Sequence, residues 1–341
     1  MKGSLALLDM GMAALLVDGR LNDLLVDPAE DNPIPRPEAI YRGILDRPLK
    51  GMHGAIVKLP DGQNGFLKDA KGIAPGTALL VQVATYAEAG KAAPVTRRIL
   101  FKSRYAIVTP NAPGINVARS IHDEEERVRL LEIAHGVMDG AGEGLILRSA
   151  CENVEDAQII DDITKMLTAS RAVADGAVGK TPELLFDAPV AADRAWRDWD
   201  VDRMDDSADV FEHHGVLDEI DIAKQPRVNM SGGGWISVEP TLAMVAIDVN
   251  TGGDFSPAAG LKTNLAAAKE ISKQLKIRGL GGQITIDFAP CSKKDRIKVE
   301  NALKAALRRD GVDTILAGWT PLGNMELQRK RERYSLSEAL T

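Results

Sequence analysis

Two patterns of hydrophobic and polar positions divide the chain. Up to about residue 101 the apolar runs are short and are separated by Gly, Pro and Asp-Gly turn signals, a pattern typical of β-strands. Residues 1–35 show it first as a strand, a tight turn and a strand, followed by the Pro-rich acidic break DPAEDNPIPRPEA. The runs between about 40 and 101, of which GTALLVQV is the clearest, predict a small β-barrel.

From residue 235 onward, strand and helix patterns alternate. WISVEP, TLAMVAIDVN and QITIDF have strand patterning, whereas TNLAAAKEISKQLKIR and SKKDRIKVENALKAALRRD have helical spacing. This alternation predicts an α/β sheet with parallel strand pairs. Thr263 or Asn264 is expected to cap the first helix, and Ser292 with Asp295 resembles a capping box at the second. Residues between about 105 and 230 are less regular, apart from the helical pattern DEEERVRLLEIAHGVMDG and the strand pattern GEGLILRSA.

Length and composition favour a multidomain soluble protein. With 341 residues the chain exceeds what one core usually serves, and its 45% apolar and 27% charged residues are ordinary for a soluble chain. Asp9 interrupts the apolar start and no small-residue cleavage pattern follows, so we expect a cytoplasmic protein without a membrane partner. Cys151 and Cys291 lie far apart, which favours buried thiols over a disulfide or a zinc site.

Charge is distributed unevenly along the chain. The net charge of −7 argues against a nucleic-acid partner, but residues 262–333 contain 16 Lys and Arg against 8 Asp and Glu. Such asymmetry is typical of polyanion binding at the basic end. Solvated helix faces of mixed charge would explain it equally well.

Two predicted strands each present a carboxylate near their carboxyl end. Because side chains alternate along a strand, Asp248 and Asn250 share one face, and Asp287 lies opposite the apolar face of QITIDF. Adjacent carboxylates repel each other unless a cation lies between them, and oxygen ligands suit Mg²⁺. Asn250 could orient Asp248 by hydrogen bonding. Asp and Asn at strand ends also commonly shape turns, so the spacing alone leaves both interpretations open.

The segments AIDVN and KTNLAAAKEISKQLKIRGLGGQITIDF closely resemble the catalytic segment of the ribonuclease E/G family. IYRGILDR and NGFL are similar to the RNA-binding barrel of that family, GEGLILRSA to its 5′-end sensor, and VNMSGGGWISVEPT to the lead-in to its catalytic domain. The resemblance therefore covers most of the chain. It implies an α+β multidomain fold, with an OB-fold β-barrel inserted near the N-terminus of an RNase H-like portion and a DNase I-like α/β catalytic domain.

The resemblance also implies domain boundaries. The expected segments are an N-terminal part of the RNase H-like subdomain (1–38), an OB-fold RNA-binding domain (39–104), a 5′-sensor-like subdomain (105–168), the shortened remainder of the RNase H-like subdomain (169–225) and the catalytic domain (226–341).

The activity that the resemblance implies is cleavage of single-stranded RNA by a Mg²⁺-dependent endoribonuclease. Asp248 and Asp287 would hold the metal, with Asn250 as the supporting catalytic residue. A metal-activated water would leave 5′-phosphate and 3′-hydroxyl ends, in ribosomal RNA processing or messenger RNA decay.

Three further groups of residues match RNA-binding positions of the family. Phe66 resembles an aromatic that stacks on a base, although a barrel-core phenylalanine has the same pattern. Arg148 and Ser149 match an Arg-Thr pair that reads a 5′-monophosphate; the alternative is an exposed strand end. The stretch Arg329, Lys330 and Arg331 is expected to contact the RNA backbone, or else to form a solvated cationic helix end.

The chain also departs from the family pattern. No Arg occurs between Asn250 and Lys262, residues 289–291 (Ala-Pro-Cys) replace Ile-Asp-Met, and acidic residues follow Ser149. The Cys-Pro-x-Cys zinc link is absent, so zinc-linked tetramers are not expected and a homodimer without zinc stays open. Two rival interpretations remain: a catalytically inactive RNA-binding protein of the same family, and a metal-dependent phosphatase or DNA nuclease with a similar α/β core.

Overall fold

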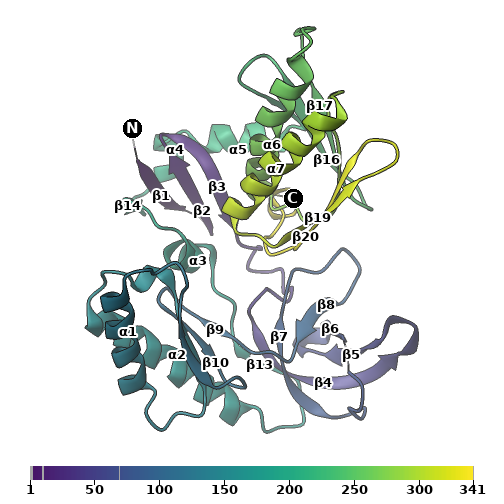
Figure 1. The fold of residues 1–341 in the computed structure, drawn as a ribbon. Coiled ribbons are helices and arrows are strands. Elements are labelled where there is room, and N and C mark those ends of the chain that lie inside the picture. Colours follow the sequence, from purple (N-terminus) through teal and green to yellow (C-terminus); the bar gives the residue numbers. More distant parts are fainter. Residues whose placement is uncertain (1–2, 10, 69, 341) are drawn as a thin grey trace. The chain divides into compact units, whose positions relative to one another are not determined.

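The computed structural model describes residues 3–9, 11–68 and 70–340, with the side chain of Lys50 excepted. Strands and helices are mixed in an α+β fold with four sheets among these residues (Figure 1). The chain divides into two compact units. We call Asp31–Asp200 the inserted unit, and Met1–Glu30 together with Val201–Thr341 the discontinuous unit.

A small barrel forms the first half of the inserted unit. Its strands are β4 (Ile40–Leu49), β5 (Gly54–Lys58), β6 (Asn64–Lys68), β7 (Ala78–Val83) and β8 (Ala93–Thr96). They hydrogen-bond in the order β4-β5-β6-β8-β7, and a further β4–β7 pairing closes the five-stranded, OB-like barrel. Leu45, Val57 and Val81 fill its interior. The predicted small barrel between about 40 and 101 is confirmed.

One strand of the barrel sheet comes from far along the chain. β13 (Glu183–Phe186) pairs with β4 outside the closed ring, in a region whose sequence pattern predicted no regular structure. Arg42 on β4 fixes this connection, because its guanidinium donates to the carbonyls of Gly176 and Thr181 and pairs with Glu183.

The second half of the inserted unit is a four-stranded sheet with two long helices. The sheet order is β11 (Gly114–Val117), β12 (Gly144–Leu147), β10 (Ala106–Thr109) and β9 (Phe101–Lys102). The helices are α1 (Glu124–Val137), α2 (Asp156–Gly176) and the shorter α3 (Ala191–Asp198). Asp123 caps α1, since its carboxylate accepts from the backbone N–H groups of Glu125 and Glu126. Leu130, Leu145 and Ile159 belong to the shared core.

The first sheet of the discontinuous unit corrects one expectation. Residues 1–35 form three strands rather than two: β1 (Ser4–Asp9), β2 (Met12–Val17) and β3 (Arg20–Val26), with β14 (Arg203–Asp205) beside β1. The apolar stretch conceals an additional reversal at Gly11, whose φ of 72° only glycine adopts easily. The helices α4 (Val210–His213) and α5 (Val216–Lys224) contribute Phe211 and Ile220 to the core of this sheet.

The second sheet of this unit contains the predicted parallel pair. Its strands, in spatial order, are β15 (Arg227–Asn229), β16 (Trp235–Pro240), β17 (Val245–Asn250), β18 (Gly282–Asp287), β20 (Met325–Arg329) and β19 (Thr314–Trp319). β17 and β18 run parallel, and the other neighbouring pairs run antiparallel. The remaining helices are α6 (Ala259–Ile277), α7 (Lys293–Asp310) and α8 (Leu336–Ala339).

The helix ends agree with the sequence in one case and differ in the other. Ser292 caps α7 as predicted, because its hydroxyl accepts from the backbone N–H of Asp295 at 3.2 Å. Helix α6, by contrast, begins at Ala259, so Thr263 and Asn264 lie inside it and are buried. Capping preference alone placed the start one turn too late, because tertiary packing extends the helix toward its N-terminus. Among the described residues, no helix combines the length and hydropathy that a membrane span requires.

Candidate metal and nucleic-acid sites

Asp248 and Asp287 are direct neighbours across the parallel strands β17 and β18. Adjacent strands lie about 4.8 Å apart, so the two carboxylates project side by side from one face of the sheet. Both residues are exposed, whereas Ile247 and Ile286 on the opposite face are buried. The predicted alternation of faces is confirmed, and it brings the two acidic side chains together.

Asn250 and Ser237 flank this carboxylate pair. The Asn250 side-chain amide donates to Oδ2 of Asp248 at 2.5 Å, the orienting contact expected from the sequence. Ser237 on β16 is the register partner of Asp248 on its other side, and its hydroxyl donates to Glu239. A row of oxygen-bearing side chains therefore crosses three strands at the level of Asp248.

The donor set fits a magnesium ion better than a zinc ion. Mg²⁺ accepts one or two protein carboxylates and keeps several waters, whereas structural zinc sites need four tightly placed ligands. Within the described part of the chain, no group of three or more His, Cys, Asp or Glu side chains is placed to hold a metal. An ion held by two carboxylates that face solvent would keep coordination positions for water and for a phosphate oxygen.

The segment after Asp287 is held by helix α6. The Asn264 amide donates to the carbonyl of Ala289 at 2.8 Å and accepts from its N–H at 3.0 Å. A Cβ at Gly260 would lie 2.2 Å from the carbonyl oxygen of Pro290, so α6 approaches this backbone too closely for any side chain. These contacts fix the end of β18, and with it the direction of the Asp287 side chain.

A glycine turn packs against the end of β17, just beyond Asn250. A Cβ at Gly252 would lie 2.1 Å from the carbonyl oxygen of Gly233, and one at Gly234 would lie 2.9 Å from that of Asn250. A cavity of about 200 Å³ lies next to this turn and is lined by Asp254 and Lys262, among others. The three consecutive glycines at 232–234 are the sequence feature that permits this close backbone packing.

Phe66 lies on β6 with its side chain partly exposed. Its neighbours along the strand, Gly65 and Leu67, are buried, so Phe66 points away from the barrel interior. A Cβ at Gly54 would come within 2.5 Å of the Phe66 ring, so the ring packs over that glycine. Phe66 therefore lies outside the buried barrel core, and the alternative of a core phenylalanine is wrong.

Arg148 is held in an ion-pair network of the inserted unit. Its guanidinium pairs with Asp198 at 2.9 Å and donates to the Ser103 carbonyl at 2.6 Å. Asp198 also pairs with Arg197, which in turn binds Glu38. Burial would raise the pKa of Asp198, but the Arg197 and Arg148 guanidiniums hold it below its usual range.

Ser149 follows directly and is exposed at the start of a short 3₁₀ turn (Ser149–Cys151). Cys151 in that turn is fully buried, and burial raises the pKa of its thiol to about 12. Cys291 is only partly buried, so the expectation of two buried thiols is right for Cys151 and wrong for Cys291.

The structure places Arg329 differently from the expectation. It is 1% exposed on β20, where Nη1 pairs with Asp310 and donates to Thr314, each at 2.9 Å. Its buried guanidinium is thus engaged inside the protein and offers no contact to RNA. Lys330 is half-exposed and pairs with Asp313. These residues lie at the end of a strand, so the alternative of a cationic helix end is also wrong.

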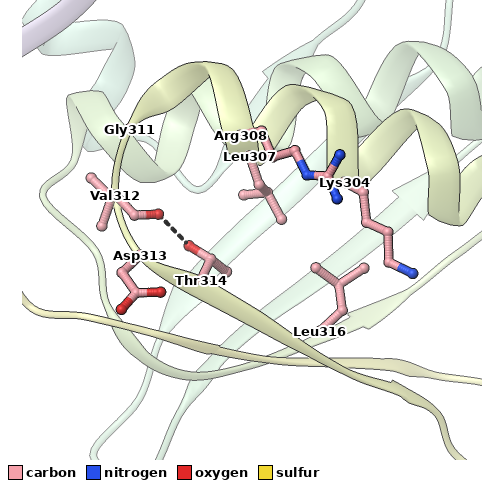
Figure 2. A pocket seen from close by; sticks show the side chains of 8 residues that line it. All are labelled: Lys304, Leu307, Arg308, Gly311, Val312, Asp313, Thr314 and Leu316. Atoms are coloured by element: carbon pink, nitrogen blue, oxygen red, sulfur yellow. Dashed lines mark hydrogen bonds between the residues drawn. The ribbon is translucent and has the colours of Figure 1, made fainter. Parts of the chain in front are cut away.

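A cavity of about 400 Å³ includes Thr314, the hydrogen-bond partner of Arg329, in its lining. Figure 2 shows its basic residues Lys304 and Arg308 on α7 and Leu316 on β19. Thr314, which lines the cavity, pairs in register with Arg329 of β20. Arg329 in turn pairs in register with Gly282, the first residue of β18. Asp287 ends that strand five residues later, about 17 Å away at the usual strand rise. The cavity is therefore separate from the carboxylate pair.

The sites together define an α+β protein that combines a closed five-stranded barrel with a two-carboxylate site on an α/β sheet. Residues 101–206 and 199–332 match the sequence profile of the Ribonuclease E/G family. The chain belongs to this family.

Individual relatives are similar over most of the chain. It is 30% identical to ribonuclease E of Synechocystis sp. and of Nostoc sp., over 88% of this chain and 53% and 52% of those proteins. It is 28% identical to ribonuclease G of Escherichia coli, over 88% of this chain and 74% of that protein. The chain thus spans about half the length of the two ribonuclease E relatives.

Proposed function

We propose that this protein is a Mg²⁺-dependent endoribonuclease that cleaves single-stranded RNA. The observation that carries the proposal is the register pairing of Asp248 with Asp287, two exposed carboxylates side by side at the ends of parallel strands. Family membership supports the same reaction class, because the relatives found are named ribonucleases E and G. In this proposal residues 226–341 are a DNase I-like catalytic domain.

The proposed mechanism assigns a task to each residue of the site. Asp248 and Asp287 hold the ion, and Asn250 keeps the Asp248 carboxylate in one orientation through its amide N–H. When bound, Mg²⁺ supplies an activated water and neutralises charge on the phosphodiester. Cleavage leaves a 5′-phosphate and a 3′-hydroxyl end.

The inserted unit supplies RNA recognition in this proposal. The barrel (39–104) acts as an OB-fold RNA-binding domain in which the outward-facing Phe66 ring stacks on a base. Arg148 and Ser149, in a 5′-sensor-like subdomain (105–168), contact a 5′-monophosphate after Arg148 leaves Asp198. Residues 1–38 and 169–225 form the RNase H-like portion.

In the discontinuous unit, Lys330 and Arg331 contact the RNA backbone, and Arg329 supports their strand from inside. The proposed setting is the cytoplasm, in ribosomal RNA processing or messenger RNA decay. A homodimer that is not linked by zinc is the proposed assembly.

A second candidate is an RNA-binding protein without catalytic activity. It is favoured by the stretch between Asn250 and Lys262, which contains no arginine to support a phosphate beside the metal. The retained Asp248–Asn250 contact argues for the enzyme, because an idle site has no need to orient one carboxylate.

Cleavage of a 5′-monophosphorylated single-stranded RNA distinguishes the two candidates. The wild type is expected to cut internally only with Mg²⁺, and Asp248→Asn and Asp287→Asn are expected to bind the RNA without cutting it. Asp218→Asn, an exposed carboxylate of α5 in the same unit, serves as the matched control and should cut normally. Binding without cleavage by the wild type would overturn the enzymatic proposal.

A further inference from the structure

A cavity of about 320 Å³ lies in the discontinuous unit, away from the residues assigned above. Its lining combines α5, β16, the connection from α6 to β18, and α8. The lining includes Ala223, Pro226, Val238, Arg278, Leu280 and Leu336. Leu280 precedes β18 at the end opposite Asp287, so the cavity is distinct from the carboxylate pair. Its volume is at the lower end of the range for small-molecule sites.

Arg278 places a buried cation in this mostly apolar lining. It caps the C-terminus of α6 and is 6% exposed. Its Nε donates to the Gln274 side chain at 2.9 Å and its Nη1 to the Val238 carbonyl at 3.4 Å. Among the described residues, its buried Nη2 has no acceptor. A buried donor without an acceptor is costly, so an acceptor that reaches this guanidinium would be bound favourably.

The other buried arginines differ from Arg278 in their ion pairs, although Nη2 of Arg329 also lacks a partner among the described residues. Arg42, Arg197 and Arg329 are buried to a similar degree, and each pairs with a carboxylate of the protein. Arg278 has no such ion pair within the described part of the chain. Burial lowers the pKa of Arg278 to about 10, and the charge of Glu270 opposes this shift. The guanidinium is therefore charged at neutral pH without a direct ion pair among the described residues.

We propose that this cavity binds a small molecule with a carboxylate on an apolar body, the carboxylate pairing with the Arg278 guanidinium, which belongs to the lining. The apolar walls select the body, and the single cation of the lining without an ion pair among the described residues selects a monoanion. A phosphate dianion fits less well, because the other cation of the lining, Lys224, already pairs with Asp221, and Glu239 adds negative charge. The binding requires neither Mg²⁺ nor RNA.

The test is a ligand-observed NMR titration of the full chain with 3-phenylpropionate as the probe. The expected dissociation constant is on the order of 1 mM, the scale for a ligand of this size. Arg278→Met should weaken binding by about tenfold or more, and the neutral 3-phenylpropanamide should bind the wild type correspondingly less well. Arg309→Met, an exposed arginine on α7, is the matched control and should bind like the wild type.

A second variant tests the cavity without changing Arg278. Ser337 is exposed and belongs to the lining, so Ser337→Trp should fill the opening and abolish binding while thermal unfolding stays unchanged. This variant decides the question if Arg278→Met does not fold. Equal binding of acid and amide, unchanged binding by Ser337→Trp, or tighter binding of inorganic phosphate than of 3-phenylpropionate would each overturn the proposal.

Discussion

The carboxylate pair of the discontinuous unit and the ion network of the inserted unit treat charge in opposite ways. Asp248 and Asp287 are like charges placed side by side, exposed, and supported mainly by one neutral amide from Asn250. Asp198, in contrast, is shared between Arg148 and Arg197, so its charge is compensated within the protein. Uncompensated carboxylates are suited to a cation from solution, whereas compensated groups primarily stabilise the fold. A cation in such a network must leave its partner before it binds a ligand.

The largest expected effect comes from a compensated pair that is fully buried. Arg329→Met leaves Asp310 buried without its partner and should cost about 3–5 kcal/mol of unfolding free energy, measured by urea denaturation. Lys330→Met removes an exposed pair and should cost about 0–1 kcal/mol. Equal losses in the two variants would contradict the structural role of Arg329.

Asn250→Ala tests the uncompensated site. Loss of the amide that orients Asp248 should lower the cleavage rate by about 10–100-fold and raise the Mg²⁺ concentration needed for half-maximal activity. Asn229→Ala, on strand β15 of the same sheet, is the control and should change neither quantity. A cleavage rate that falls without any change in Mg²⁺ dependence would mean that Asn250 does not act through the metal.

Acid pH should weaken the compensated network. Burial would raise the pKa of Glu38 and Asp198, but Arg197 and neighbouring cations hold both below their usual values. Their stabilising contribution is present above the unfolded-state pKa and is lost as pH falls through the lower folded-state values. Urea denaturation from pH 6 to pH 3 should show this loss in the wild type, and Arg197→Met should show less of it. Identical pH profiles would contradict the pairing.

The smallest effect is expected where a compensated cation must be released. Asp198→Asn weakens the ion pair that retains Arg148, a contact whose free energy is about 1 kcal/mol or less. The binding preference for 5′-monophosphorylated over 5′-hydroxyl RNA should therefore rise a few-fold. Fluorescence anisotropy with the two RNAs measures this preference. The double variant Asp198→Asn with Arg148→Met should lose the gain, and an unchanged preference in the single variant would remove Arg148 from end recognition.

Local patterns predicted correctly which faces of their strands Asp248 and Asp287 occupy. The alternation in AIDVN and QITIDF determines which side chains leave the buried face, and the helix between them is the connection typical of a parallel pair. The register that places Asp248 beside Asp287 is set by how the two strands pack together, and the local sequence does not specify it.

Long-range packing explains what the sequence did not show. Arg329 reads as part of a basic stretch, but it is buried because Asp310, 19 residues earlier, supplies a partner. β13 joins β4 across more than 130 residues of chain, so its short pattern gave no sign of a strand. The side chain of Asn264 is occupied by the backbone of Ala289, so it does not cap the helix. Helix α6 instead begins at Ala259.

The central claim is that Asp248 and Asp287 act as one metal site, and a double-mutant cycle tests it most directly. Cleavage rates would be measured at saturating Mg²⁺ for Asp248→Asn, Asp287→Asn and the double variant. Each single variant should lose about 10²–10³-fold, the scale for removing an electrostatic contact to the transition state, and the double variant should be hardly slower than either. Losses that simply multiply in the double variant would contradict a shared site.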